Sequence, residues 1–121
     1  MVKVLLDTNV LVDFLRGIPA AQAELARYDD AAISVITWIE VLVDAPPALA
    51  RSTRDFLNDF RLLELDSEVA GGAVAIRQAH RLKLPDAIIW ASAQVHARLL
   101  VTRDTKGFPA DDPGVRVPYA V

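Results

Sequence analysis

The segment VKVLLDTNVL (residues 2–11) contains the clearest indication of how this chain folds. It begins with a short and almost wholly apolar run, which is typical of a central parallel strand that is buried on both faces. Asp7, Thr8 and Asn9 follow, and all three are residue types that favour the N-terminus of a helix. The apolar residues after them recur at helical spacing. The segment therefore predicts a buried strand that leads directly into a helix.

The same alternation of apolar strands and amphipathic helices continues along the chain and predicts an α/β fold. Further strands are expected at residues 31–35, 62–65 and 99–102, with a short edge strand at residues 115–117. Helices are expected at residues 10–15, 21–28, 37–43, 49–60, 67–80 and 85–95. Because helices separate the strands, we expect a parallel sheet of four to five strands with right-handed crossovers.

Length and composition indicate one globular domain that covers residues 1–121. The chain is 53% hydrophobic and 24% charged, which is sufficient for a core of its own. It has no cysteine, which excludes disulfide scaffolds, thiol nucleophiles and cysteine zinc sites. No apolar run approaches the roughly 18 residues of a membrane helix, and Asp7 interrupts the first run. We therefore expect a cytoplasmic protein without a signal peptide or membrane contact.

The net charge of −3 argues against a protein that binds polyanions without specificity. The charge is distributed unevenly, because residues 1–50 contain three basic and seven acidic residues, whereas residues 51–121 contain ten basic and nine acidic residues. A local contact with nucleic acid is therefore expected mainly from the second half of the chain.

Four carboxylates occupy positions that would bring them to one edge of the predicted sheet. Asp7 directly follows the first strand, and Asp104 lies just past the fourth. Glu40 falls early in the helix after the second strand, and Asp86 begins the helix that leads into the fourth. In such sheets, ligand sites form beyond the carboxyl ends of the strands. The topology therefore predicts one shared site.

Carboxylates packed together repel one another, so they either take up protons or bind a cation. Oxygen ligands without cysteine or paired histidine suit Mg²⁺ or Mn²⁺, which can activate water and neutralise a phosphoryl oxygen. The expected chemistry is phosphodiester hydrolysis. Each acid also has a structural explanation, since Asp7 and Asp86 could cap helices and Asp104 could be a solvated loop residue. Glu40 is harder to explain in this way, because its sequence neighbours are apolar.

Four segments together resemble the PIN-domain family and, within it, the VapC-type toxins of bacterial toxin–antitoxin pairs. They are VLLDTNVL (residues 4–11), TWIEVL (37–42), LPDAII (84–89) and LVTRDTKGF (100–108). One segment alone would be weak, but four in the family's order, spread over essentially the whole chain, are specific.

The resemblance implies a three-layer α/β/α sandwich and a Mg²⁺- or Mn²⁺-dependent endoribonuclease. By motif position, the family's acidic quartet falls on Asp7, Glu40, Asp86 and Asp104. The three aspartates would hold the metal directly or through water, and Glu40 would orient a metal-bound water or help to hold a second ion. The polar residues that brace the acids would be Thr8, Asn9 and Thr102. The family also implies a homodimer and a cognate VapB-type antitoxin whose tail enters the acidic groove.

Two positions depart from the family pattern. Gly107 stands where the family often has an acid, so Asp104 is left as the fourth acid. Trp90 stands where a small residue is more usual, so the packing after Asp86 is expected to differ locally.

Contact with RNA requires cations near the cleaved phosphate. Six basic residues are candidates: Arg16, Arg77, Arg81, Lys83, Arg103 and Lys106. Arg103 and Lys106 are favoured because they flank Asp104. His80 and His96 lack the spacing of a metal-ligand pair, so zinc is not expected.

Three other functions remain open from the sequence. A phospho-receiver signalling domain has similar length and topology, with Asp66 as the phosphoacceptor, but it needs paired acids after the first strand. A phosphatase of the haloacid dehalogenase type needs an aspartate where this chain has Asn9. The third is a non-catalytic interaction domain whose acids only cap helices.

Overall fold

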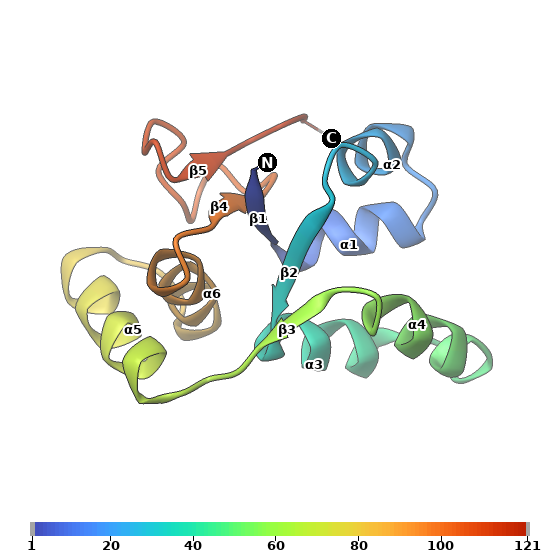
Figure 1. Ribbon diagram of the computed structural model, residues 1–121, viewed down its shortest axis with the longest axis horizontal. Coiled ribbons are helices and arrows are strands. Elements are labelled where there is room, and N and C mark those ends of the chain that lie inside the picture. Colours follow the sequence, from blue (N-terminus) through green and yellow to red (C-terminus); the bar gives the residue numbers. More distant parts are fainter. Residues whose placement is uncertain (1, 121) are drawn as a thin grey trace.

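The computed structural model describes residues 2–120 and contains a five-stranded parallel sheet in the order β3-β2-β1-β4-β5 (Figure 1). The strands are β1 (Lys3–Leu6), β2 (Asp30–Ser34), β3 (Arg61–Leu63), β4 (Leu99–Val101) and β5 (Val115–Arg116). β1 lies in the centre and pairs with β2 on one side and with β4 on the other. The predicted parallel sheet is confirmed, including its short edge strand.

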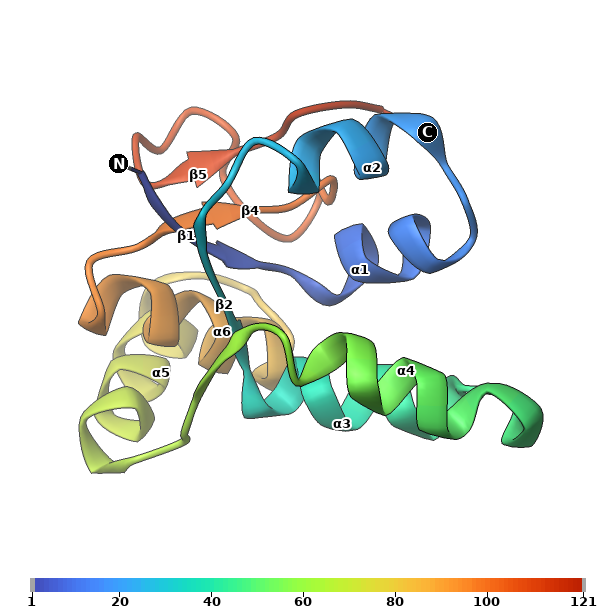
Figure 2. The ribbon, with the colours of Figure 1, turned by 45° about the vertical axis from the view of Figure 1, so that its right-hand side comes forward.

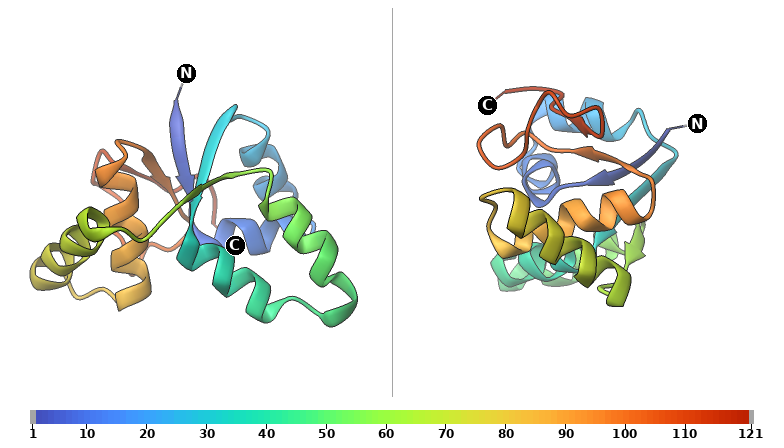
Figure 3. Two further views of the ribbon diagram at one scale, coloured as in Figure 1. Left: turned by 60° about the horizontal axis from the view of Figure 1, so that its bottom comes forward. Right: turned by 90° about the vertical axis from the view of Figure 1, so that its left-hand side faces the viewer.

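Helices connect the strands and cover both faces of the sheet. They are α1 (Thr8–Leu15), α2 (Pro19–Leu25), α3 (Val35–Asp44), the 3-10 turn η1 (Pro47–Leu49), α4 (Ala50–Leu57), α5 (Ser67–Ala79) and α6 (Leu84–Val95). α5 and α6 lie on one side of the strands, and α1, α2 and α4 lie on the other (Figures 1 and 3). This is the expected three-layer α/β/α sandwich. Within residues 2–120, we find no helix that is both long and apolar enough to span a bilayer.

The side chains of β1 alternate between two hydrophobic cores. Leu5 belongs to the core under α5 and α6, together with Ile89. Val4 and Leu6 belong to the core on the opposite face, together with Leu11 of α1. None of these five side chains has exposed surface. Because successive side chains of a strand point to opposite faces, a strand between two helical layers must be apolar at consecutive positions.

Helix α3 begins earlier than predicted. We expected a strand through residue 35 and a helix capped by Thr37, but β2 ends at Ser34, whose Oγ accepts a hydrogen bond from Ile36 N at 3.1 Å. Thr37 is fully buried inside α3. β2 and α3 are joined without a loop. Because the residues on either side of Ser34 are apolar, the sequence does not show where the strand ends and the helix begins.

Trp90 packs into the core between α6 and the loop after β4. Its ring lies edge-on to Phe108, with ring centroids 6.0 Å apart, and 5.1 Å from His80. His96 is the C-cap residue of α6. The structure thus gives both histidines positions in the packing and capping of helices.

After β5 the chain runs back across the molecule towards α2 (Figure 2). Arg116 of β5 forms a two-point ion pair with the buried Glu24 of α2, with Nε–Oε2 and Nη2–Oε1 distances of 2.7 and 3.0 Å. Tyr28 also donates a hydrogen bond to Glu24. Burial works against ionisation of Glu24, but the hydrogen bonds from Arg116 and Tyr28 outweigh it and lower its pKa. The pair fixes the edge strand to the helical layer.

Candidate active site

The four predicted acids line one pocket at the carboxyl ends of the strands. The pocket has a volume of about 310 Å³, and its walls include Asp7, Glu40, Asp86 and Asp104, together with Thr8, Asn9, Val12 and Arg103. We refer to it as the acid pocket. Larger cavities of about 570 and 480 Å³ lie over the helices, but their walls are mainly apolar. The convergence that the topology predicted is therefore present.

Asp7 is the most tightly held of the four acids. It is the N-cap of α1, and its Oδ1 accepts a hydrogen bond from Thr8 N at 2.8 Å. Its Oδ2 accepts from Thr102 Oγ1 at 2.7 Å and from Asn9 Nδ2 at 3.3 Å. The Thr102 hydroxyl also accepts from Asp104 N at 3.0 Å, so one buried side chain links two acids of the pocket. Thr102 and Asn9 therefore both hold the Asp7 carboxylate in place.

Thr8 braces Glu40 with its side chain. Its Oγ1 donates to Glu40 Oε1 at 2.8 Å. The hydroxyl of Thr37 lies 2.9 Å from that of Thr8, and because the single proton of Thr8 is directed to Glu40, Thr37 must be the donor of this second bond. Sequence analysis missed this role of Thr37. Its position three residues before Glu40, on the same face of a helix, is the signal that would have identified it.

Burial and neighbouring charges make Asp7 and Asp86 harder to ionise. Burial raises the pKa of Asp7 to about 6, and the charges of Asp86 and Glu40 add to the rise. Burial also raises the pKa of Asp86, followed by the charges of Asp104 and Glu40, while Lys83 opposes the shift. The pocket therefore favours either a proton or a cation.

Asp104 folds back onto its own loop. Its Oδ1 accepts hydrogen bonds from the backbone N–H groups of Lys106 and Gly107, at 2.9 and 3.2 Å. A Cβ atom at position 107 would lie 2.8 Å from Asp104 Oδ2, closer than any normal contact. The glycine that departs from the family pattern is thus the residue that gives the Asp104 carboxylate its room.

The donor set of the acid pocket fits a hydrated Mg²⁺ or Mn²⁺ ion. All four acids are oxygen donors, which these ions prefer, and their mutual repulsion is the kind that a divalent cation relieves. Among residues 2–120, no three acids or histidines are close enough to one another to ligate a single ion together. Mg²⁺ usually retains several waters and binds through one or two carboxylates, so it does not need a closed protein cage.

Of the six predicted RNA-contact residues, Arg103 lines the acid pocket. Lys83 is the N-cap residue of α6, three residues before Asp86, and Lys106 is exposed beside Asp104. Arg81 is exposed and lies in the segment between α5 and α6. Arg16 and Arg77 line the two apolar cavities over the helices and do not contribute to the walls of the acid pocket. Only part of the predicted basic set is therefore placed beside the acids.

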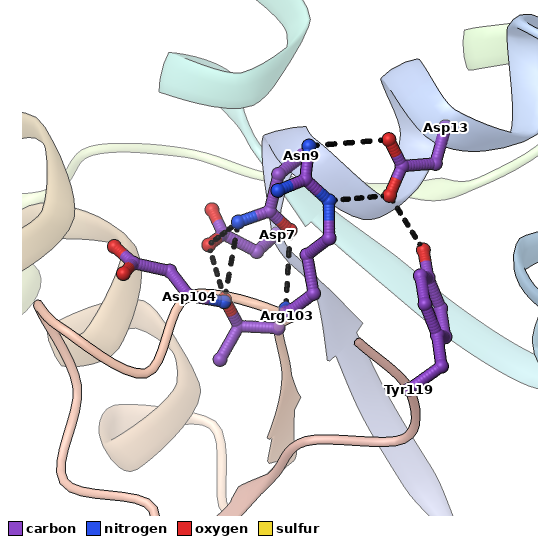
Figure 4. A network of polar contacts seen from close by, with 7 residues as sticks. Asp7, Asn9, Asp13, Arg103, Asp104 and Tyr119 are labelled. Atoms are coloured by element: carbon purple, nitrogen blue, oxygen red, sulfur yellow. Dashed lines mark hydrogen bonds and ion pairs between the residues drawn. The ribbon is translucent and has the colours of Figure 1, made fainter. Parts of the chain in front are cut away.

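A fifth carboxylate lies next to the pocket, and sequence analysis missed it. Asp13 of α1 is 1% exposed and accepts hydrogen bonds from Arg103 Nε on Oδ2 and from Arg103 Nη2 on Oδ1, the latter at 3.2 Å (Figure 4). Tyr119 Oη donates to the same Oδ2 at 2.9 Å. Asp13 follows Asn9 by four residues and so lies on the same face of α1, which is the signal that could have identified it.

Asp66, the phosphoacceptor of the phospho-receiver alternative, does not line the acid pocket. It is exposed, and it caps α5 by accepting a hydrogen bond from Val69 N at 2.9 Å. The structure therefore provides no support for that alternative.

Comparisons with known proteins identify the family and the fold. The sequence model of the PIN domain matches residues 4–110. A chain of the toxin–antitoxin complex from Klebsiella pneumoniae is 43% identical, with a TM-score of 0.93 over 98% of this chain and 100% of that chain. A chain of FitAcB from Neisseria gonorrhoeae is 29% identical, with a TM-score of 0.75 over 95% of this chain and 97% of that chain.

VapBC2 from Rickettsia felis, bound to a DNA fragment from its promoter, is 20% identical and shares the fold, with a TM-score of 0.76 over 95% of this chain and 96% of that chain. No protein in the curated comparison set matches this sequence. The resemblance read from the four sequence segments is confirmed by the family model and by these structures. The chain belongs to the PIN-domain family.

Proposed function

We propose that this protein is a Mg²⁺- or Mn²⁺-dependent endoribonuclease and the toxin of a toxin–antitoxin pair. The observation that supports the proposal most strongly is the convergence of Asp7, Glu40, Asp86 and Asp104 on one pocket. Helix capping alone gives no reason for acids from four separate segments to meet. The 43% identical chain from a toxin–antitoxin complex supports the same function.

Asp7, Asp86 and Asp104 would hold the cation, either directly or through bound water. When bound, the metal would lower the pKa of water and neutralise charge on a phosphoryl oxygen. Asp7 is immobilised by three hydrogen bonds, so it would contribute a ligand of fixed position. Glu40 Oε1 accepts a hydrogen bond from the Thr8 hydroxyl. The other oxygen of Glu40, Oε2, would therefore orient the attacking water. Hydrolysis in line would leave a 5′-phosphate and a 3′-hydroxyl.

A cognate antitoxin of VapB type is the proposed protein partner. An apolar groove of about 480 Å³ lies between α1, α3 and α4, with Leu15, Val41, Leu49 and Phe56 in its walls. Val12 lines both this groove and the acid pocket, so the two lie next to each other. An antitoxin segment with apolar side chains followed by a basic residue would cover the groove and neutralise the acids together.

The proposal is tested by comparing Asp7→Asn with Asp66→Asn. Both aspartates are N-caps that accept a backbone N–H on Oδ1, and both substitutions keep a capping residue while removing a charge. The wild-type protein and Asp66→Asn should cleave single-stranded RNA with Mn²⁺ or Mg²⁺ and stop in EDTA, whereas Asp7→Asn should be inactive but folded. A wild-type protein that is inactive with either metal, or that cleaves RNA equally well in EDTA, would contradict the proposal.

A further inference from the structure

Among residues 2–120, Arg103 is the one basic residue in the walls of the acid pocket, yet it does not form an ion pair with the pocket's acids. An arginine beside several carboxylates is expected to bind one of them through two parallel hydrogen bonds. Arg103 makes this two-point contact with Asp13, outside the pocket, through Nε and Nη2. Figure 4 shows its side chain extending towards Asp13, in a different direction from the neighbouring Asp104.

The contact between Arg103 and Asp13 is well built. Asp13 is 1% exposed, and its Oδ2 receives two donors, Arg103 and Tyr119. The backbone N–H of Arg103 is also fixed, since it donates to Asn9 Oδ1 at 3.3 Å. A buried carboxylate needs such complete pairing, because an unpaired charge in this position would be strongly destabilising. Three separate segments, α1, the loop after β4 and the segment after β5, therefore fix one guanidinium group.

We propose that Asp13, supported by Tyr119, is a positioning residue that holds the Arg103 guanidinium off the carboxylates of the acid pocket and thereby leaves them free for a divalent cation. Without Asp13, the arginine would be a tethered cation at the pocket's edge and would compete with the metal for Asp7, Asp86 and Asp104. The inference rests on the proposed function in one respect, namely that the pocket binds a divalent cation.

The chain contains a matched control for this proposal. Glu24 and Arg116 form the same kind of buried two-point pair, and Tyr28 donates to Glu24 as Tyr119 does to Asp13. This second pair does not line the acid pocket. Glu24→Gln should therefore reproduce the structural cost of breaking such a pair without placing a cation beside the acids.

The test is direct binding of Mn²⁺ in the absence of RNA, measured by electron paramagnetic resonance or calorimetry. Asp13→Asn should weaken Mn²⁺ binding about 10-fold or more. Glu24→Gln should bind as the wild-type protein does, and the double variant Asp13→Asn, Arg103→Gln should regain the wild-type affinity. This rescue separates competition by Arg103 from collapse of the site, because the double variant lacks the ion pair as well.

Unchanged Mn²⁺ affinity in Asp13→Asn, or a double variant that stays as weak as the single one, would overturn the proposal. If thermal unfolding shows that Asp13→Asn does not fold, Tyr119→Phe replaces it, with a loss of affinity of about twofold or more and the same rescue by Arg103→Gln. Equal affinity of Tyr119→Phe and the wild-type protein would then overturn it. A protein that binds Mn²⁺ as expected but does not cleave RNA refutes the proposed function and leaves this inference standing.

Discussion

At the residue scale, the acid pocket depends on hydroxyl groups that connect carboxylates. Thr102 joins Asp7 to the backbone of Asp104, and Thr8 joins Thr37 to Glu40. Thr8 and Thr102 were expected from the sequence, because both stand in segments that resemble the family's motifs. Helical spacing marked Thr37 and Asp13 as facing the site, but it could not show their partners. These lie 29 and 90 residues away in the sequence and are brought close only by the folded sheet.

The raised pKa of Asp7 predicts a pH-dependent effect on stability in metal-free protein. The folded pKa, about 6, lies above the ordinary value of 3.8, so folding takes up a proton between these values. The contribution of Asp7 to stability is full below pH 3.8 and is lost as the pH rises through about 6. Asp7→Asn should therefore be more stable than the wild-type protein at pH 8 by up to about 3 kcal/mol, with a smaller difference at pH 4.

Urea unfolding in EDTA at the two pH values measures this difference. Adding Mg²⁺ at pH 8 should stabilise the wild-type protein and not the variant, because only the former retains the full set of carboxylates. A variant that is less stable than the wild-type protein at pH 8 would show that the hydrogen bonds of Asp7 outweigh the burial of its charge.

At the element scale, the conformation of the loop after β4 could be predicted only in part. The sequence indicated a loop from residue 104 onward and singled out Gly107 as a departure from the family pattern. It could not show that the carboxylate of Asp104 turns back to bind Lys106 N and Gly107 N, which is a matter of loop geometry. In the same way, the start of α3 was predicted too late, because Ser34 is both the last residue of β2 and the N-cap of α3.

Gly107→Ala should reduce activity without unfolding the protein. The added Cβ would lie 2.8 Å from Asp104 Oδ2, and the carboxylate would move because it is the end of a flexible side chain. A displacement of about 1 Å at a catalytic group can cost up to about 100-fold in rate. Gly71→Ala in α5 is the matched control, because no atom lies within 4 Å of its Cβ, and it should gain up to about 1 kcal/mol of stability with unchanged activity. The RNA cleavage rates and melting temperatures of the two variants test this prediction. Equal activity of Gly107→Ala and Gly71→Ala would contradict it.

At the scale of the whole molecule, large apolar side chains remain exposed on α5, on α6 and on the segment before α5. Leu65, Val74 and Leu84 are 44%, 57% and 55% exposed, and all three line the apolar cavity between α5 and α6. Contiguous exposed apolar surface of this kind marks association sites. Together with the resemblance to VapC-type toxins, it supports the proposal of a homodimer.

Light scattering at micromolar concentration should therefore give twice the mass of one 13.2 kDa chain. Val74→Glu should reduce the proportion of dimer, because it places a charge on the exposed apolar surface, whereas Val43→Glu on α3, at a position that is 76% exposed and outside this cavity, should not. A single-chain mass for the wild-type protein would exclude the dimer at that concentration.

The division of the interior into two cores has a consequence for the acid pocket. Asp7 caps α1, which is anchored in one core, whereas Asp86 is carried by α6, which is anchored in the other. Glu40 is carried by α3, which packs against both cores through Val41 and Ile36. The distances between these carboxylates thus report how the two helical layers are aligned across the sheet. Truncating a buried side chain in either layer, far from any acid, should weaken metal binding even where the protein stays folded. A second substitution that restores the metal affinity would then be found in the layer on the opposite side of the sheet.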